Sequence, residues 1–242
     1  MEILEAFAGK EVNDFVFFMD MRGTTAKLNT AWRSDNILDR AEVAHSQTHF
    51  ISILGVLCKE RPMIEAAQVS DCVFFHSAKI EDCLDFACAT FKHMTVRGDK
   101  FSAWSLRGGG GRGLNRFLCG DEIRTLTNFS FSSVLGVGNV QAAMLESEGP
   151  KGMRLFVTKE VGEEAKKVGR FLLREVKVAD QSCYEVNWMR PDGIVPDYLG
   201  LTKESRLISD HLRERGELFQ KSGVGHQVDL GSSWLDLLGW TK

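Results

Sequence analysis

Residues 15–25 read FVFFMDMRGTT, and this stretch decides how the chain is interpreted. The short aromatic and apolar run over 15–20 predicts a central β-strand that is covered on both faces. The strand ends on the carboxylate of Asp20, which is costly to bury unless a partner such as a metal ion binds it. We therefore predict a strand whose end carries a functional acid. The alternative is a carboxylate that caps the next turn or helix.

Composition indicates a globular protein. The 242 residues are 43% hydrophobic and 26% charged, with a formal net charge of -3, and we expect a single domain over 1–242. Lys and Arg are spread along the chain and outnumbered by acids, which argues against a nucleic-acid partner. No apolar run reaches the roughly 18 residues that span a bilayer, and the first residues are acidic where a secretory signal would be basic. We expect no membrane partner and a cytoplasmic location.

Cysteine and histidine offer no strong metal motif. The six cysteines form no Cys-x-x-Cys pair and most lie in apolar segments, so we expect reduced, packed thiols. His45 and His49 have the spacing of two metal ligands on one helical face. Because no obvious third ligand accompanies them, we expect packed or surface histidines. The cysteines are Cys58, Cys72, Cys83, Cys88, Cys119 and Cys183.

The first half of the chain predicts two helices around a hairpin. Apolar residues at helical spacing over 35–57 predict one long helix or two broken ones, and Pro62 ends it. Residues 63–77 read as two short strands joined by a tight turn at Ser70 and Asp71. Residues 80–94 then form an amphipathic pattern typical of a helix.

Glycine punctuates the second half. Residues 101–113 begin as a strand and become almost pure glycine, which permits close approach of a ligand or another backbone, or a bulge. A glycine turn and helix follow over 135–149, and a strand over 152–158. The order strand, helix, hairpin, helix, strand predicts an α+β fold of the ferredoxin-like, split βαβ type.

We place this core at about 12–160 and a C-terminal extension at about 161–242. The extension carries a predicted strand over 183–190 and an exposed amphipathic helix over 203–220. Its expected role is to support a dimer.

The second acid of interest is Asp71, at the turn between two apolar strands. If the hairpin pairs beside the first strand, the carboxylates of Asp20 and Asp71 converge. Two such groups repel unless they are protonated or bridged by a divalent cation, and their hard oxygens suit Mg²⁺ or Mn²⁺. A site with two ions about 4 Å apart serves phosphoryl transfer.

Five segments resemble, in order and spacing, the motifs of nucleotidyl cyclases of the adenylate and guanylate cyclase type. Each motif is weak alone, but together they cover most of the span 15–158. They are FMDMRGTT (18–25), SD (70–71), LRGGGGRG (106–113), GVGNVQAAMLE (136–146) and GPKGMRLFVT (149–158).

This resemblance implies an enzyme, with two Mn²⁺ or Mg²⁺ ions held by Asp20, Asp71 and the backbone of Met21. It also implies that the turn after Asp20 binds the substrate's triphosphate, and we expect phosphate contacts there. The alternative for the two threonines is helix capping. The residues of that turn are Met21, Gly23, Thr24 and Thr25.

Further site residues are candidates only. An arginine should offset the developing negative charge, and Arg107 and Arg154 are the candidates. Arg107 could instead contact the base or pair with an acid. Phe50 could stack on a flat pyrimidine, although its helical apolar pattern is typical of a core residue.

The departures from the family pattern point to an unusual substrate. Matching the motifs puts Val140 at the position of the family's catalytic Asn and Met144 at that of its transition-state Arg. Asn139, one place away, is the candidate to replace the catalytic Asn. The alternative is an ordinary turn residue. The purine-reading Lys falls in AAQ (66–68), and its Asp partner falls on Val137. The pattern looks most like the pyrimidine cyclases of Pycsar antiphage systems.

That likeness implies a homodimer with composite active sites and a separate effector that senses the product. We expect a uridylate cyclase that converts UTP into cyclic UMP and pyrophosphate. The alternatives are a cytidylate cyclase, an adenylate or other purine cyclase, and a catalytically silent nucleotide-binding or dimerisation module. A diguanylate cyclase is disfavoured because the expected turn of two glycines, two acids and a phenylalanine is absent.

Overall fold

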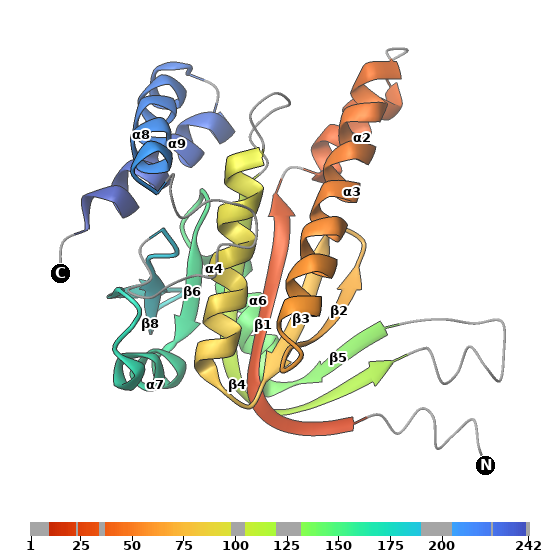
Figure 1. Cartoon of the computed structure of the whole chain (residues 1–242), viewed down its shortest axis with the longest axis vertical. Helices are drawn as coiled ribbons and strands as arrows, with labels where there is room; N and C mark the ends of the chain where they lie inside the picture. The colour runs from red at the N-terminus through yellow and green to blue at the C-terminus, as the bar shows by residue number, and fades with distance from the viewer. Residues whose placement is uncertain are drawn as a thin grey trace, which may run out of the picture.

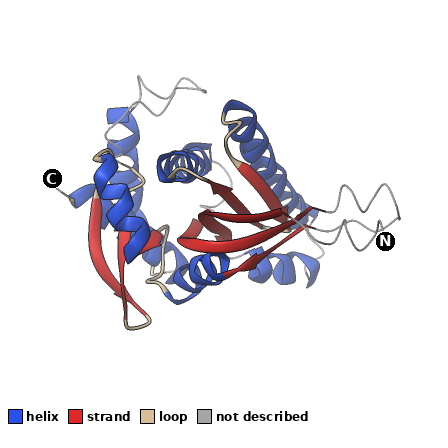
Figure 2. Ribbon diagram, turned by 90° about the horizontal axis from the view of Figure 1, so that it is seen from below, coloured by secondary structure: helices blue, strands red, loops and turns tan. Residues whose placement is uncertain are grey.

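The computed structural model describes residues 10–22, 24–33, 37–97, 105–119, 132–189, 205–223 and 225–240. Within these residues eight strands form one sheet, flanked by helices (Figures 1 and 2). Seven of the strands lie in the order β2-β3-β1-β4-β6-β8-β7, and β5 pairs with β4. The mixed α+β class that the sequence predicts is confirmed. The strands are β1 (Lys10–Arg22), β2 (Glu65–Val69), β3 (Cys72–Ser77), β4 (Ser105–Cys119), β5 (Ser132–Gly136), β6 (Leu155–Thr158), β7 (Leu173–Val178) and β8 (Gln181–Val186).

The helices divide between the two faces of the sheet. Helices α3 and α4 lie in front of it and α6 lies behind it in Figure 1. The apolar run of β1 explains this layering, since alternate residues of a strand face opposite sides. Phe17 and Met19 are fully buried in the core on the α4 side. The helices are α2 (Thr24–Arg33), α3 (Ile37–Glu60), α4 (Ile80–Arg97), α6 (Val137–Glu148), α7 (Lys159–Val168), α8 (Ser205–Lys221) and α9 (Gly225–Gly239).

The glycine run of β4 lets α6 lie directly on the sheet. A Cβ built on Gly109 would lie 1.9 Å from the carbonyl oxygen of Ala142 in α6, so no larger residue fits there. A Cβ on Gly110 would instead meet the ring of Phe17 on the other face. The glycines therefore serve close packing of another backbone, which is one of the interpretations that the sequence leaves open.

The structure decides between the two alternatives for the first predicted helix and adds one helix that was not predicted. Residues 37–60 form a single helix, α3, which decides between the one-helix and two-helix alternatives. Helix α2 was not predicted; its sequence TTAKLNTAWR begins with two threonines, which are weak helix formers. No described helix is long and apolar enough to span a membrane.

The C-terminal extension joins the same sheet. Strand β8 pairs antiparallel with β6, and β7 pairs with β8. Helix α9 is attached to these strands by an ion-pair network in which Asp236 contacts Arg154 at 3.0 Å and Arg174 at 2.8 Å. Both arginines also pair with the buried Glu185. The guanidinium of Arg174 lies over the ring of Trp240, 4.2 Å from its centre.

Candidate active site

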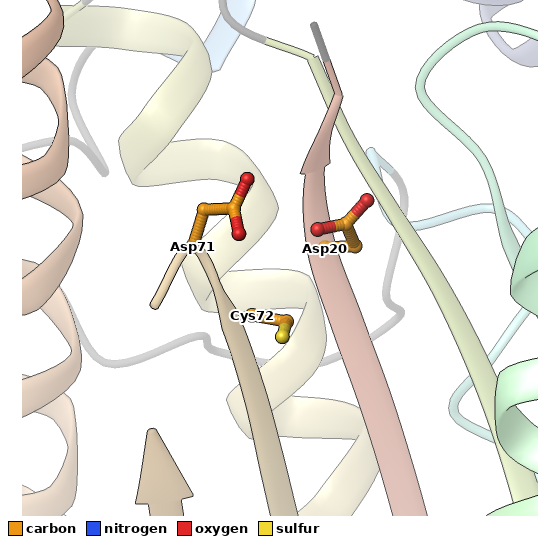
Figure 3. Close-up of side chains that lie close together, drawn as sticks. All are labelled: Asp20, Asp71 and Cys72. Atoms are coloured by element: carbon orange, nitrogen blue, oxygen red, sulfur yellow. The ribbon is translucent and has the colours of Figure 1, made fainter. Parts of the chain in front are cut away.

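Strand register brings the two predicted acids together. Asp20, near the end of β1, lies opposite Cys72 of β3 and opposite Arg107 of β4. The backbone N–H of Met21 donates to the carbonyl of Asp71 at 3.1 Å, which ties the β2–β3 turn to the end of β1. Figure 3 shows the carboxylates of Asp20 and Asp71 facing each other, with the sulfur of Cys72 beside them. One ligand atom from each of the three side chains lies within 4.8 Å of the other two.

The turn that carries Asp71 is tight. Ser70 and Asp71 alone connect β2 to β3, and Ser70 has a φ of 57°. A non-glycine residue in this left-handed region is strained. The turn nevertheless places Asp71 one residue before the position opposite Asp20, which no looser connection would guarantee.

The surroundings of Asp20 disfavour its ionised form. Burial, and then the negative charges of Glu146 and Asp71, raises the pKa of Asp20 from 3.8 to about 6. Arg22 and Arg107 act in the opposite direction without cancelling the effect. A divalent metal ion held between the carboxylates would favour the ionised form of Asp20, because opposite charges attract. The oxygen donors of Asp20 and Asp71 fit Mg²⁺ or Mn²⁺.

Two charged residues of the site were not assigned from the sequence. Buried Glu146 of α6 pairs with Arg22 at 2.7 Å and lies 3.8 Å from Nε of Arg107. Arg22 has a signal that could have found it, because it stands two residues after Asp20 and so faces the same side of β1. Glu146 ends one of the quoted motifs, but only the packing of α6 on β4 brings it to Asp20.

Arg107 lies opposite Asp20 on the neighbouring strand β4. Burial, and then the charge of Arg22, lowers the pKa of Arg107 to about 10. Its Nη2 donates to the carbonyl of Gly149 at 2.8 Å, while its buried Nε has no hydrogen-bond partner among the described residues. The structure thus brings Arg107 to the acidic pair. It places the side chain of Arg154 elsewhere, in the network with Glu185 and Asp236.

The segment after Asp20 leads directly into a helix. The hydroxyl of Thr24 is buried and donates to the carbonyl of Met21 at 2.9 Å. Since the N–H of Met21 is also bonded, it is not free for a phosphate, and this part of the expectation needs correction. Helix α2 begins at Thr24, and the first amides of a helix lack intrahelical acceptors. Gly23 and the side chain of Thr25 lie outside the described residues.

Phe50 lies in the core. It is 0% exposed within α3, so the expectation that it stacks on a base is wrong for this structure, and the core alternative holds. The apolar stripe of the helix accounts for this placement.

Asn139 lies away from Asp20 within the chain. It stands in the first turn of α6, where its Nδ2 donates to the carbonyl of Val134 at 2.8 Å and its N–H donates to Oδ1 of Asn115 at 3.0 Å. The adjoining Gly138 lies against Gly111, four residues along β4 from Arg107, which is about 13 Å. His45 and His49 are not part of the one group of three or more metal-ligating side chains found among the described residues.

Comparisons with known proteins agree with this architecture. No family model and no curated protein matches the sequence. Among solved structures, the guanylyl cyclase domain of the RhoGC fusion protein from Blastocladiella emersonii is 14% identical with a TM-score of 0.57, over 74% of this chain and 96% of its own. The adenylyl cyclase CyaB from P. aeruginosa is 18% identical with a TM-score of 0.54, over 73% and 95%.

The guanylate cyclase domain of RhGC from Catenaria anguillulae, solved in complex with GTP, is also similar, with 14% identity and a TM-score of 0.57 over 73% of this chain and 97% of its own. The chain has the fold of a nucleotide cyclase catalytic domain. The fold that the resemblance implied is therefore confirmed.

Proposed function

We propose that this protein is a nucleotide cyclase that converts UTP into 3′,5′-cyclic UMP and pyrophosphate. The observation that carries the proposal is the convergence of Asp20 and Asp71, with the raised pKa of Asp20, on a fold shared with adenylyl and guanylyl cyclases. A protein that used this fold only to bind or dimerise would gain nothing from two acids that destabilise each other.

In the proposed reaction the ribose 3′ oxygen attacks the α-phosphorus and loses its proton, while the bond to the pyrophosphate breaks. Asp20 and Asp71 would hold Mn²⁺ or Mg²⁺ ions, which when bound supply charge neutralisation and a more acidic 3′ hydroxyl. The chain itself mainly aligns the substrate. The N-terminus of α2 offers amides to the phosphates, and Arg107, opposite Asp20 in the sheet, adds a positive charge.

The preference for a pyrimidine rests on what the purine-reading positions hold. Ala67 lies opposite Phe74 in the β2–β3 pairing, and Phe74 lies opposite Phe18, so Ala67 faces the same side as Asp20. Ala66 and Ala67 have no side-chain group that could hydrogen-bond a purine, and the side-chain amide of Gln68 donates to the carbonyl of Ser70 at 3.0 Å. Val137 is apolar and 58% exposed. Cyclic CMP from CTP is the second candidate, and a purine cyclase is the third.

A homodimer is part of the proposal. Exposed apolar side chains gather where β5 runs into α6, and burying them against a second copy would remove them from water. Asn139 belongs to the same junction, so in a dimer it could serve the partner's active site although it lies far from Asp20 in its own chain. The exposed residues are Leu135, Val137 and Val140.

The product would act in antiphage defence through a separately encoded effector.

The test uses the purified full chain with Mn²⁺ and each of the four ribonucleoside triphosphates in turn. Mass spectrometry follows the cyclic product and an enzymatic assay follows pyrophosphate. We expect UTP to be used best, and Asp20→Asn and Asp71→Asn each to lower turnover at least about a hundredfold. Asp14→Asn is the matched control, since Asp14 is on the same strand and face but pairs with His76 at 2.7 Å.

Selective use of ATP or GTP would contradict the base preference. Absence of a cyclic product from all four substrates would contradict the cyclase assignment and favour the silent module.

A further inference from the structure

Cys72 occupies an unexpected place for a thiol. It is the first residue of β3, directly opposite Asp20, and it is half-buried. Its sulfur shares the 4.8 Å cluster with an oxygen of Asp20 and an oxygen of Asp71 (Figure 3). The expectation of a packed core thiol is therefore wrong for Cys72, because the strand register turns it toward the acids.

The donor set differs from a purely acidic one. Mg²⁺ and Ca²⁺ prefer oxygen ligands alone, whereas a thiolate favours softer cations such as Zn²⁺ and Cd²⁺. Two carboxylates and one thiolate offer three protein ligands to such an ion. Solvent or a substrate oxygen would complete its coordination.

We infer that Cys72, Asp20 and Asp71 form a mixed oxygen and sulfur site that binds a thiophilic divalent cation through all three side chains. The site shares its carboxylates with the proposed function, but its occupancy does not depend on turnover. On binding, the S–H bond of Cys72 breaks, the proton leaves to solvent and a sulfur–metal bond forms. No oxidation or reduction takes place.

The geometry requires little movement. With Zn–S near 2.3 Å and Zn–O near 2.1 Å, donors on opposite sides of one ion lie about 4.4 Å apart, and donors at tetrahedral angles lie closer. The observed cluster, spanning at most 4.8 Å, needs to contract by about 1 Å. Side-chain rotation can supply this, because Asp71 and Cys72 stand at the tip of a hairpin.

One existing contact has to be given up. The thiol of Cys72 donates to the carbonyl of Val69 at 2.9 Å, and this hydrogen bond is lost when the sulfur becomes a ligand. A thiol is a weak donor, so the loss is small beside a bond to a metal ion. The nearby guanidinium of Arg22 stays paired with Glu146 and not with Asp71.

The experiment titrates Cd²⁺ into the purified full chain, without nucleotide, and follows the ultraviolet charge-transfer absorption of a thiolate–cadmium bond. We expect a saturable band in the wild type. Cys72→Ser should abolish it and lower Cd²⁺ affinity at least about tenfold, while changing Mn²⁺ affinity much less. Cys58→Ser is the matched control: Cys58 is also half-buried, but its charged neighbour is Arg61, which repels cations.

Two further measurements keep the test decisive if Cys72→Ser folds poorly. Excess Mn²⁺ should displace the band in the wild type, and Asp71→Asn should weaken Cd²⁺ binding at least about tenfold with the band still present at saturation. A wild type without the band, or a band that Mn²⁺ and Cys72→Ser leave unchanged, would overturn the inference.

The outcome is separable from that of the proposed function. A Cd²⁺ band that depends on Cys72 in a protein that cyclises no nucleotide would support the mixed site and contradict the cyclase. Cyclase activity without such a band would support the cyclase and contradict the mixed site.

Discussion

Replacing Asp20 by asparagine should stabilise the metal-free protein at neutral pH. The acid is half-buried and lies beside Glu146 and Asp71, and its pKa rises from 3.8 to about 6 on folding. The folded chain therefore holds a proton on Asp20 over a pH range in which the unfolded chain has released it. Stability falls as the pH rises through this window, between about 4 and 6. Asparagine has nearly the same shape but carries no charge, so the variant does not have the cost of ionising residue 20 in the folded chain.

The size of the effect follows from the shift. A rise from 3.8 to about 6 corresponds to about 3 kcal/mol of unfolding free energy at full strength. Solvent screens a half-buried group, so we reduce this to about 1.5 kcal/mol. In a chain of 242 residues that amounts to a melting temperature higher by about 3 to 6 °C.

Differential scanning calorimetry in EDTA at pH 4, 6 and 7.5 would measure the melting temperatures of the wild type and Asp20→Asn. The gain of Asp20→Asn over the wild type should be close to zero at pH 4 and full at pH 7.5. Adding Mn²⁺ should reverse the order, because only the wild type keeps both carboxylates. A variant that is less stable than the wild type at pH 7.5 in EDTA would refute the reasoning.

Four further substitutions test the packing, the turn and the ion-pair network. Gly109→Ala should lower the free energy of unfolding by about 3 kcal/mol or more, because the new Cβ would meet the backbone of Ala142 at 1.9 Å. Gly55→Ala is the control, because a Cβ there meets nothing within 4 Å. Chemical denaturation should show that it raises the free energy of unfolding by about 0.5 to 1 kcal/mol. Ser70→Gly should raise the melting temperature slightly, by relief of about 0.5 to 1 kcal/mol at a φ of 57°, and a loss would argue against the tight turn. Asp236→Asn should cost about 1 kcal/mol at neutral pH and expose α9 to limited proteolysis. Because hydrogen bonds from Arg174 lower the pKa of Asp236 to about 2, the wild-type advantage should fade as the pH drops below 4; an unchanged difference would contradict this.

The parts of the site that local pattern could predict are those that depend on one strand and one turn. An apolar run ending on Asp20 and a hairpin tipped by Asp71 are short-range features, and their order along the chain predicted that they would meet. Close approach of another backbone was one of the interpretations of the glycine run, and the structure shows that α6 is what packs there.

The parts that could not be predicted depend on long-range packing. Glu146 reaches Asp20 only because α6 crosses β4 without side chains between them, and Cys72 faces Asp20 only because of the register of β3. The sequence made Arg154 a candidate catalytic cation, but in the structure Asp236 of helix α9 pairs with it. The helical apolar pattern around Phe50 was visible in the sequence and is typical of the core position that the structure shows.

The most direct test of the account is the anomalous diffraction of crystals grown with Mn²⁺ and a non-cyclisable UTP analogue. Our account predicts manganese peaks between the carboxylates of Asp20 and Asp71, in contact with the triphosphate. Bound nucleotide with manganese elsewhere, or carboxylates turned away from it, would contradict the account.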